Sequence, residues 1–333
     1  MVAYASALSG STWIELDGQD AGALHSVEGG EPYAQVVREP VPNPTDVAGK
    51  HLGAIGYSDI AIECDLVPSG PLLSWINATL GRSSSLHSGV IVELDRHDRE
   101  ISRLAFSDAV IREIEFPAVD AGGKQPAYLT VRFASQWTQR HKGSQSTVLR
   151  TGVSMSTRAA PISAFRLTVN GLGTTQVSTV GPLVVRQELQ SSVAADGTVR
   201  LAPASVDISD LVVTLSEADD WYAWRDAFMV QGTGAERIGT LEYLKRDLHG
   251  VLAQIDFTGL GLHSLVAERS DEDAHKGARR VQASMYCENL SYRPAAGASH
   301  SAAAEAALPS RVEVITPLAG RRSFARPEFA SPS

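Results

Sequence analysis

Acidic and histidine side chains gather at one short stretch of the sequence, where they could bind a metal ion or transfer protons. Asp95, His97 and Asp98 lie between two apolar runs that predict neighbouring strands. Charged residues at a hairpin tip are typical of a turn in contact with water, and His249 lies at the matching turn later in the chain. We therefore interpret both turns as structural and predict neither a metal site nor an acid–base pair.

The sequence motifs of common enzymes and nucleotide-binding proteins do not occur in this chain. The sequence contains no HExxH, CxxC or GxSxG, and no GxGxxG that follows a strand. The stretch from Gly122 to Gln125 lacks the earlier glycine, and the Ser or Thr after lysine, that a phosphate-binding loop requires. The sequence therefore favours a protein that is not an enzyme and uses no cofactor.

Two tryptophans, Trp75 and Trp224, each lie in a segment whose pattern predicts a helix, at 71–80 and 217–230. The residues around the first recur at a spacing of three and four and share one helix face; they are Leu72, Trp75, Ile76 and Thr79. Such tryptophans could line a ligand pocket or hold each helix against its sheet. The second interpretation is favoured, so we predict both as helix anchors.

Both helices belong to a pattern of elements that occurs twice. Residues of the same type recur at a separation of 149 to 153 positions. The pairs are Gly18 and Gly171, Asp59 and Asp210, Trp75 and Trp224, Gly89 and Gly239, Arg96 and Arg246, and Phe106 and Phe257. A near-constant separation over several elements indicates one supersecondary unit used twice.

Strand patterns dominate both copies of this unit. Apolar and polar residues alternate, as at Ile60, Ile62 and Cys64, which is typical of a strand with one buried face. Each copy is expected to have six or seven mostly antiparallel strands, including separate short strands at Ile101–Phe106, Val110–Phe116, Val251–Phe257 and Leu262–Ala267. The sequence thus predicts a mainly β fold with two tandem antiparallel β-barrels or sandwiches, each with one flanking α-helix.

The repeat and the changes in composition predict how the chain is divided. The first β domain is placed at residues 9–137 and the second at 163–293. Residues 138–162 are rich in Ser, Thr and Arg and are predicted to be a linker. Residues 294–333 are expected to form a flexible arm with one possible added strand, Arg311 to Thr316.

One segment of the first copy is rich in residues that break secondary structure. The stretch from Gly29 to Gly56 includes four prolines and five glycines, too many for a central strand. We predict a long projecting loop or a loose hairpin there. The corresponding segment of the second copy, Gln190 to Pro203, is shorter and polar. A loop as long as the stretch from Gly29 to Gly56 is usually functional or disordered.

Charge and cysteine content argue against several classes of protein. The net charge of −9 disfavours broad nucleic-acid binding, which needs a basic surface. Cys64 and Cys287 lie in apolar strand-like runs, so we interpret them as buried thiols in a reducing compartment. No apolar run approaches the roughly 20 residues of a membrane helix, and Met1 to Gly10 does not resemble a signal peptide. A soluble, cytosolic chain is expected.

Taken in order, the elements of the first copy resemble the tail tube proteins of contractile phages and related injection systems. The match covers residues 9–137: a strand with a turn glycine, a long loop, a strand, a helix with a central tryptophan, and a polar hairpin. Its most specific part is the segment from Phe106 to Pro117. The second copy, residues 163–293, follows the same order but lacks this proline and has a shortened loop.

The resemblance implies a structural subunit without a catalytic, cofactor or metal site. Tube subunits of this family form six-membered rings of barrels, whose strands join around a lumen through which cargo or DNA passes. The long loop and the chain termini are implied to connect stacked rings. The residues assigned to ring stacking in this way are Gly29, Gly30, Pro32, Tyr33, Pro40, Pro42 and Pro44.

This chain departs from the family pattern because it carries two barrels instead of one. Three chains could form a pseudo-six-fold ring, or six chains a ring two barrels thick or wide; the first needs only one kind of joint. Implied partners are further copies of the chain and other tube, baseplate or sheath proteins of a particle assembled in the cytoplasm. Nucleic acid is expected only as lumen cargo, and no membrane is expected. The alternatives are a baseplate hub, adaptor or tube-terminating protein, and a ligand-binding β-sandwich.

Overall fold

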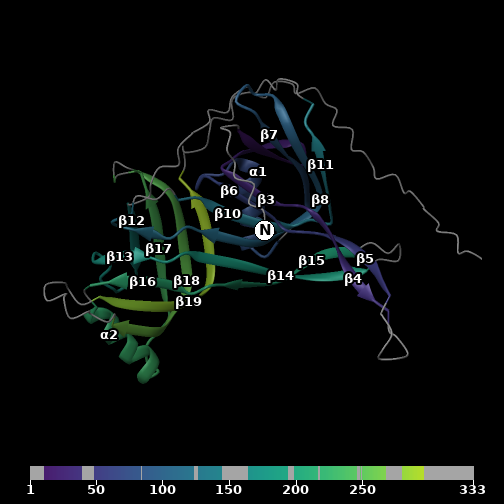
Figure 1. Cartoon of the computed structure of the whole chain (residues 1–333). Coiled ribbons are helices and arrows are strands. Elements are labelled where there is room, and N and C mark those ends of the chain that lie inside the picture. Colours follow the sequence, from purple (N-terminus) through teal and green to yellow (C-terminus); the bar gives the residue numbers. More distant parts are fainter. Residues whose placement is uncertain are drawn as a thin grey trace, which may run out of the picture. The chain divides into compact units, whose positions relative to one another are not determined.

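The computed structural model of the 333-residue chain describes residues 11–39, 49–83, 85–123, 127–144, 164–193, 199–216, 218–245, 248, 250–267 and 280–295. Within these residues the strands form two large sheets and one two-stranded sheet (Figure 1). This confirms the prediction of a mainly β protein.

The first half of the chain supplies most of the N-terminal sheet, whose strands lie in the order β2-β1-β7-β8-β10-β6-β3. β11 also pairs with β8, and β4 pairs with β5 as a separate hairpin. The elements are β1 (Thr12–Leu16), β2 (Gln19–Leu24), β3 (Ser26–Gly29), β4 (Pro32–Arg38), β5 (Lys50–Tyr57), β6 (Ile60–Cys64), α1 (Gly70–Leu80), β7 (His87–Leu94), β8 (Glu100–Phe116), β9 (Val119–Asp120), β10 (Leu129–Ala134) and β11 (Trp137–Lys142).

The second half supplies the C-terminal sheet, with the order β12-β17-β18-β19-β16-β13-β9. β14 pairs with β15 and also with β8, so this hairpin extends the N-terminal sheet. The elements are β12 (Phe165–Val169), β13 (Val177–Val180), β14 (Leu183–Val193), β15 (Val199–Ile208), β16 (Leu211–Leu215), α2 (Asp219–Arg225), the π-helix η1 (Asp226–Val230), β17 (Arg237–Leu244), β18 (Val251–Ala267) and β19 (Val281–Pro294).

Six strands follow the same order in both sheets. The order β1-β7-β8-β10-β6-β3 corresponds to β12-β17-β18-β19-β16-β13, and each of these pairs is antiparallel. The helices α1 and α2 follow the equivalent strands β6 and β16. β8 and β18 both have 17 residues. In each, the ninth residue has a positive φ, which is 48° at Asp108 and 66° at Gly259.

These positive-φ residues explain why four predicted strands are in fact two. β8 and β18 each run without interruption through the segments that the sequence assigned to separate strands. The pairing of β8 with β7 shifts register between His87 and Gly89, opposite the irregularity, and the strand continues beyond it. The shift leaves Ala109, Val110 and Ile111 buried in succession. In a sequence pattern, such a run breaks the alternation and looks like the end of a strand.

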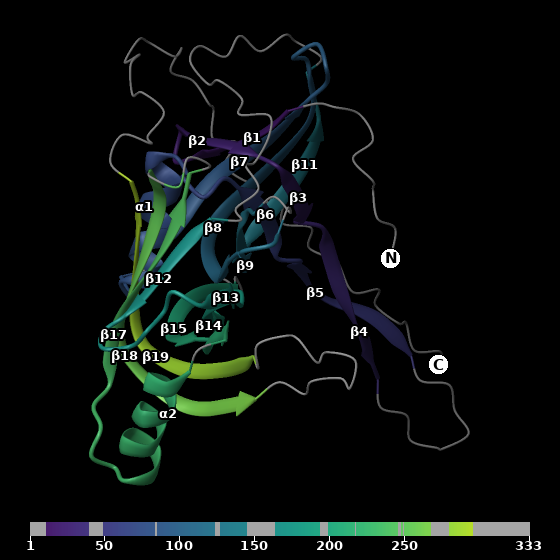
Figure 2. The same ribbon diagram turned by 90° about the vertical axis from the view of Figure 1, so that its left-hand side faces the viewer.

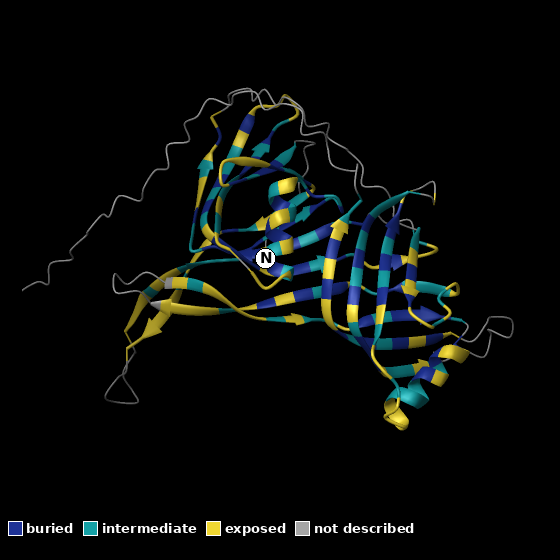
Figure 3. Ribbon diagram, turned by 180° about the vertical axis from the view of Figure 1, so that it is seen from behind, coloured by how far each residue is buried: buried dark blue, intermediate teal, exposed yellow. Residues whose placement is uncertain are grey.

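Alternation along the strands places one face of each sheet in the core, as the burial colours show (Figure 3). Ile60 and Ile62 are completely buried on β6, and the alternate residues Ala61 and Glu63 are half-buried. The helix α1 has Pro71 in its first turn and ends before Gly81, close to the predicted bounds. The predicted second helix is divided: α2 ends at Arg225 and a π-helix follows.

The first β region extends further than the sequence suggested. β11 continues to Lys142, so residues 138–142 pair with β8 and do not belong to a linker. Their polar composition concealed the strand, because only Thr138 among them is buried. Residues 145–162 of the predicted linker and the predicted strand from Arg311 to Thr316 lie outside the described residues.

Candidate assembly interface

The hairpin of β4 and β5 exposes an unusual concentration of apolar side chains. Figure 2 shows it extending away from the strands next to it. Of the twelve large hydrophobic residues that are exposed in the described part of the chain, five belong to this hairpin: Tyr33, Val36, Val37, Leu52 and Ile55. Their exposed fractions range from 41% to 72%. Exposed apolar side chains gathered on one element in this way are typical of a contact with another protein.

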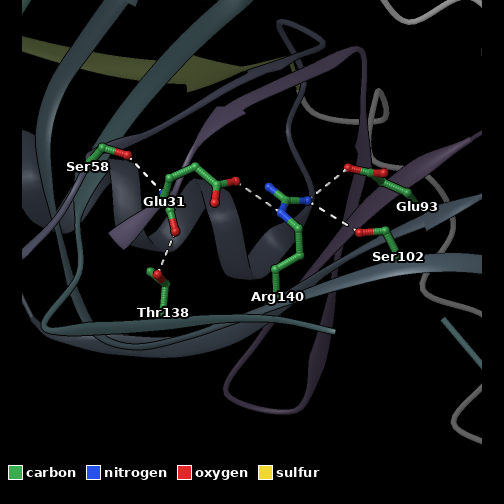
Figure 4. Close-up of polar contacts among 7 residues, drawn as sticks. Glu31, Ser58, Glu93, Ser102, Thr138 and Arg140 are labelled. Carbon is green, nitrogen blue, oxygen red and sulfur yellow. Dashed lines mark hydrogen bonds and ion pairs between the residues drawn. The ribbon is translucent and has the colours of Figure 1, made fainter. Parts of the chain in front are cut away.

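A set of hydrogen bonds holds the base of this hairpin (Figure 4). The Glu31 amide donates to Ser58 Oγ at 3.0 Å, and the Ser58 amide donates to the Glu31 carbonyl at 2.9 Å. The buried Thr138 hydroxyl on β11 donates to the Gly30 carbonyl at 2.6 Å. We call Gly30, Glu31, Ser58, Thr138 and Arg140 the hairpin base.

Within the hairpin base, Arg140 connects Glu31 to side chains of the N-terminal sheet. Its Nε lies 3.2 Å from a Glu31 carboxylate oxygen, and its Nη1 lies 3.5 Å from Glu93 and 3.3 Å from Ser102 (Figure 4). Exposed ion pairs of this kind contribute little to stability, about 0–1 kcal/mol. Their effect here is to orient the first residues of β4 relative to β7, β8 and β11.

The two glycines predicted for ring stacking lie where β3 leads into this hairpin. Gly29 has φ +86° and Gly30 has φ +78°, a region that favours glycine. A Cβ at Gly29 would lie 1.9 Å from the Asp59 carbonyl oxygen. Pro32 and Tyr33 begin β4 and are exposed. The other predicted stacking residues, Pro40, Pro42 and Pro44, lie outside the described residues.

We expect the substitution Gly29→Ala to destabilise the fold far more than Gly18→Ala. Gly18 has a similar φ of +78°, but nothing lies within 4 Å of its added Cβ. The control therefore measures backbone strain alone, about 1 kcal/mol, whereas Gly29→Ala adds a backbone clash and should cost about 3 kcal/mol or more. Urea unfolding of the two variants checks this, and equal losses would contradict it.

The hairpin of β14 and β15 repeats the geometry of β4 and β5. The Val184 amide donates to Ser209 Oγ at 2.9 Å and the Ser209 amide to the Val184 carbonyl at 2.8 Å, as Glu31 and Ser58 do. The two hairpins also share a register shift, between Ala34 and Val36 in one and between Gln187 and Leu189 in the other.

The two hairpins differ in what lies beside them. Leu183, Val184, Val185 and Arg186 on β14 pair in antiparallel register with Phe116, Glu115, Ile114 and Glu113 on β8. We call this pairing the internal joint, because it connects the second half of the chain to the first. Leu183, Val185, Ile114 and Phe116 are all at most 2% exposed. Residues 32–38 of β4 are mostly exposed, and among the described residues no second strand covers them as β8 covers β14.

Side chains add to the internal joint. Arg186 Nε lies 2.9 Å from Glu113 Oε2, and Arg132 on β10 lies 3.8 Å from the other oxygen of the same carboxylate. The buried side-chain amide of Gln187 donates through Nε2 to the Ile111 carbonyl at 2.8 Å. The joint is therefore a backbone ladder with an ion-paired outer face and a buried hydrogen bond.

Two tyrosines of the C-terminal sheet also bond to the first half of the chain. The Tyr243 hydroxyl donates to the Pro117 carbonyl at 3.2 Å, and the Tyr292 hydroxyl donates to the Leu66 carbonyl. The Tyr292 ring packs against Phe116 with centroids 5.0 Å apart. Burial raises the pKa of Tyr292 well above its ordinary value, so this hydroxyl stays protonated as a donor.

The end of β18 offers an edge that resembles the one used in the internal joint. Residues 262–267 of β18 pair with β19 on one side. No strand in the described part of the chain pairs with their other side, whereas β14 lies at the equivalent position on β8. Leu265 and Ala267 are half-buried, and Val266 is 58% exposed. We call residues 262–267 the β18 edge.

The two tryptophans predicted as helix anchors lie in the core. Trp75 is completely buried between α1 and the sheet, with its ring centroid 5.2 Å from Phe133 and 5.1 Å from His87. Trp224 is 3% exposed; its Nε1 donates to the Ala235 carbonyl at 3.3 Å, and the Arg237 guanidinium lies over its ring at 4.9 Å.

The polar turn around Asp95 has the geometry of a closed hairpin turn. Asp95 accepts hydrogen bonds from the amides of Arg99 and His97. These bonds, that of Arg99 above all, hold the pKa of Asp95 below its ordinary value. Among the described residues, no group of three or more histidine, cysteine or acidic side chains has the geometry of a metal site.

Both cysteines are buried and free. Burial raises the pKa of Cys287 to about 11 and that of Cys64 further, so neither forms a reactive thiolate near neutral pH. None of the helices in the described ranges combines the length and the apolar composition needed to cross a membrane.

Comparisons with known proteins found matches only among solved structures. No family model and no curated protein matches the sequence. A chain in the structure of the anti-feeding prophage (AFP) baseplate matches with 15% identity and a TM-score of 0.36, over 43% of this chain and 98% of that chain. The tube-terminating cap of the same particle matches with 12% identity and a TM-score of 0.34, over 45% and 96%. The PVC sheath-tube complex, from an extracellular contractile injection system, matches with 10% identity and a TM-score of 0.33, over 40% and 89%.

Proposed function

We propose that this chain is a non-enzymatic structural subunit of a phage-tail-like tube and that it contains two tandem copies of one β module. The common order of six strands supports the duplication, as do the matching hairpin bases and the equal lengths of β8 and β18. Two ion pairs also agree. Asp59 lies 3.3 Å from Arg112, and Asp210 lies 2.8 Å from His263. Asp210 follows Asp59 by 151 residues, and His263 follows Arg112 by the same number.

The internal joint is the observation that carries the proposal. It links two like modules edge to edge through a backbone ladder, within one chain. A module that offers an edge on one side and a hairpin on the other can be joined repeatedly, and a repeated heterologous joint closes into a ring when the rotation allows it. Ring closure also leaves no unpaired strand edge at which chains would aggregate.

We favour three chains in each ring. Each chain contributes two modules, so three chains supply the six modules implied by the resemblance to tail tube proteins. Six chains would supply twelve modules, and these could close only as a ring two barrels thick or two barrels wide. A subunit with unlike hairpins in its two copies would also suit a hub, adaptor or terminating position, where the tube meets a partner of three-fold symmetry.

The outer part of the β4–β5 hairpin is proposed to connect stacked rings. Its exposed apolar residues include Val36, Val37 and Leu52, which lie beyond the base. Further partners would be tube, baseplate or sheath proteins of a particle that assembles in the cytoplasm, and the lumen would carry cargo or DNA.

Negative-stain electron microscopy of the purified full chain, with its mass measured by light scattering, tests the proposal. We expect rings of uniform bore with the mass of three chains. Long tubes would favour the repeating tube, and single rings a hub or terminating protein. Uniform monomers at every concentration would overturn the assembly proposal and favour a ligand-binding β-sandwich.

A further inference from the structure

We infer that the start of β4 in one chain pairs with the β18 edge of a second copy of this chain, in the register that β14 uses on β8. The inference rests on the proposed function and specifies its inter-chain joint. The internal joint is the template for this pairing, because both of its strands have an equivalent that is unpaired on the corresponding side within the described residues.

The register follows from two constant separations. The hairpin bases and the register shifts place β4 153 residues before β14. The positive-φ residues and the ion pairs place β8 151 residues before β18. Transferring the pairs of the internal joint by these separations predicts Gly30 opposite Ala267, Glu31 opposite Val266, Pro32 opposite Leu265, and Tyr33 opposite Ser264.

Burial at the two positions differs as expected for one filled and one open joint. Ile114 and Phe116 are completely buried on β8, where β14 covers them. Their counterparts on β18, Leu265 and Ala267, are half-buried. On the hairpin side, Val185 is 2% exposed, whereas its counterpart Pro32 is exposed. A second copy would cover both surfaces at once.

The side chains at the two joints differ in a way that distinguishes them. At the position that Arg186 has in the internal joint, the inferred joint has Tyr33. At the position of its partner Glu113, the inferred joint has Ser264. An arginine hairpin docked on the β18 edge would therefore lack its carboxylate, which favours the tyrosine hairpin there. Pro32 also lacks the N–H that Val185 carries, so the inter-chain ladder has one donor fewer and should be the weaker joint.

A cysteine pair at the predicted contact tests the register. Tyr33→Cys combined with Ser264→Cys places two thiols at a pair equivalent to Arg186 and Glu113. The Val184 carbonyl accepts from Ser209 on β15, so by alternation the Arg186 backbone also faces β15 and makes a non-hydrogen-bonded pair with Glu113. Such non-hydrogen-bonded pairs have Cα atoms about 4.5 Å apart, within the range of a disulfide. The native Cys64 and Cys287 are buried and should not compete. Mild oxidation of the assembled full chain is expected to give covalent dimers and larger species on a non-reducing gel.

Matched variants separate this joint from other contacts. Each single variant alone should stay uncrosslinked, and the two single variants co-expressed should give a dimer and nothing larger. Tyr33→Cys with Leu265→Cys moves one thiol to the opposite face of β18, because the pairing with β19 is regular from Ser264 to Ala267, and should crosslink at least tenfold less. Arg186→Cys with Glu113→Cys, at the internal joint, should crosslink within one chain only.

The failure of this inference and that of the proposed function give different results. Rings by microscopy without an inter-chain crosslink from Tyr33→Cys and Ser264→Cys would overturn the inferred joint and leave the tube proposal standing. Equal crosslinking of the Tyr33→Cys and Leu265→Cys combination would overturn the register. Monomers by microscopy and no crosslink would overturn both.

Discussion

A chain in which residues 32–57 are replaced by a two-residue Asn-Gly turn is expected to fold and to remain a monomer. The ends to be joined, Glu31 and Ser58, are already hydrogen bonded as the first pair beyond a tight hairpin turn would be. The strands β4 and β5 of this segment are mostly exposed, so their loss takes little from the core. The deletion would remove Pro32 and Tyr33, two of the four residues by which the hairpin is inferred to join a second chain, together with all of β4 and β5.

Light scattering and negative-stain microscopy measure the assembly of this variant, and thermal unfolding measures its fold. We expect the mass of one chain, no rings, and a melting temperature within a few degrees of the unaltered protein. Rings of the original diameter from the variant would show that the hairpin does not join chains.

The same replacement in the second hairpin is the matched control. Asn-Gly between Val184 and Ser209 removes residues 185–208, including Val185 and Gln187, which are 2% and 3% exposed. It also uncovers Ile114, which is completely buried. Losses of this size in a core cost several kcal/mol, so this variant should unfold early or fail to fold. The first deletion thus removes assembly and the second removes stability, although the two hairpins share a geometry.

Trp75→Ala is expected to destabilise the protein by about 3–5 kcal/mol, a large part of the stability of an ordinary domain. The indole is completely buried and packs against Phe133, and the cavity left behind would lie between α1 and the sheet. Denaturant unfolding followed by circular dichroism measures the change.

Trp75→Phe is the control that separates packing from hydrogen bonding. Trp75 Nε1 has no hydrogen-bond partner among the described residues, so phenylalanine removes volume without breaking a hydrogen bond. The cost should be clearly smaller than that of alanine. A loss below about 1 kcal/mol for Trp75→Ala would show that α1 does not depend on this side chain.

Local patterns were enough to predict much of the fold. The alternation at Ile60, Ile62 and Cys64 predicted β6, since one face of that strand is buried. Pro71 and Gly81 marked the bounds of α1 closely, because proline is tolerated in the first turn and glycine ends a helix readily. The π-helix after Arg225 was not predicted, because its residues have no pattern that distinguishes them from a continuing α-helix.

The hairpins were only partly predicted. The prolines and glycines between Gly29 and Gly56 indicated a projecting loop or loose hairpin, and the structure shows the paired strands β4 and β5. The polar composition of Gln190 to Pro203 indicates a loop shorter than the first, whereas the structure places its described residues in the longer hairpin of β14 and β15. Exposed strands lack the apolar alternation by which a strand is recognised in a sequence.

The sequence by itself determined that the chain is mainly β, that a helix follows a strand at the same place in the order of each half, and that residues of the same type recur about 150 positions apart. Only the tertiary structure decided that β14 lies on β8 while β4 and the β18 edge lack that kind of neighbour in the described residues. The physical reason is that a period of two records which face of a strand is buried, but not which strand lies beside it. That neighbour is set by contacts between residues far apart in the chain, so two hairpins with almost the same local geometry have different surroundings.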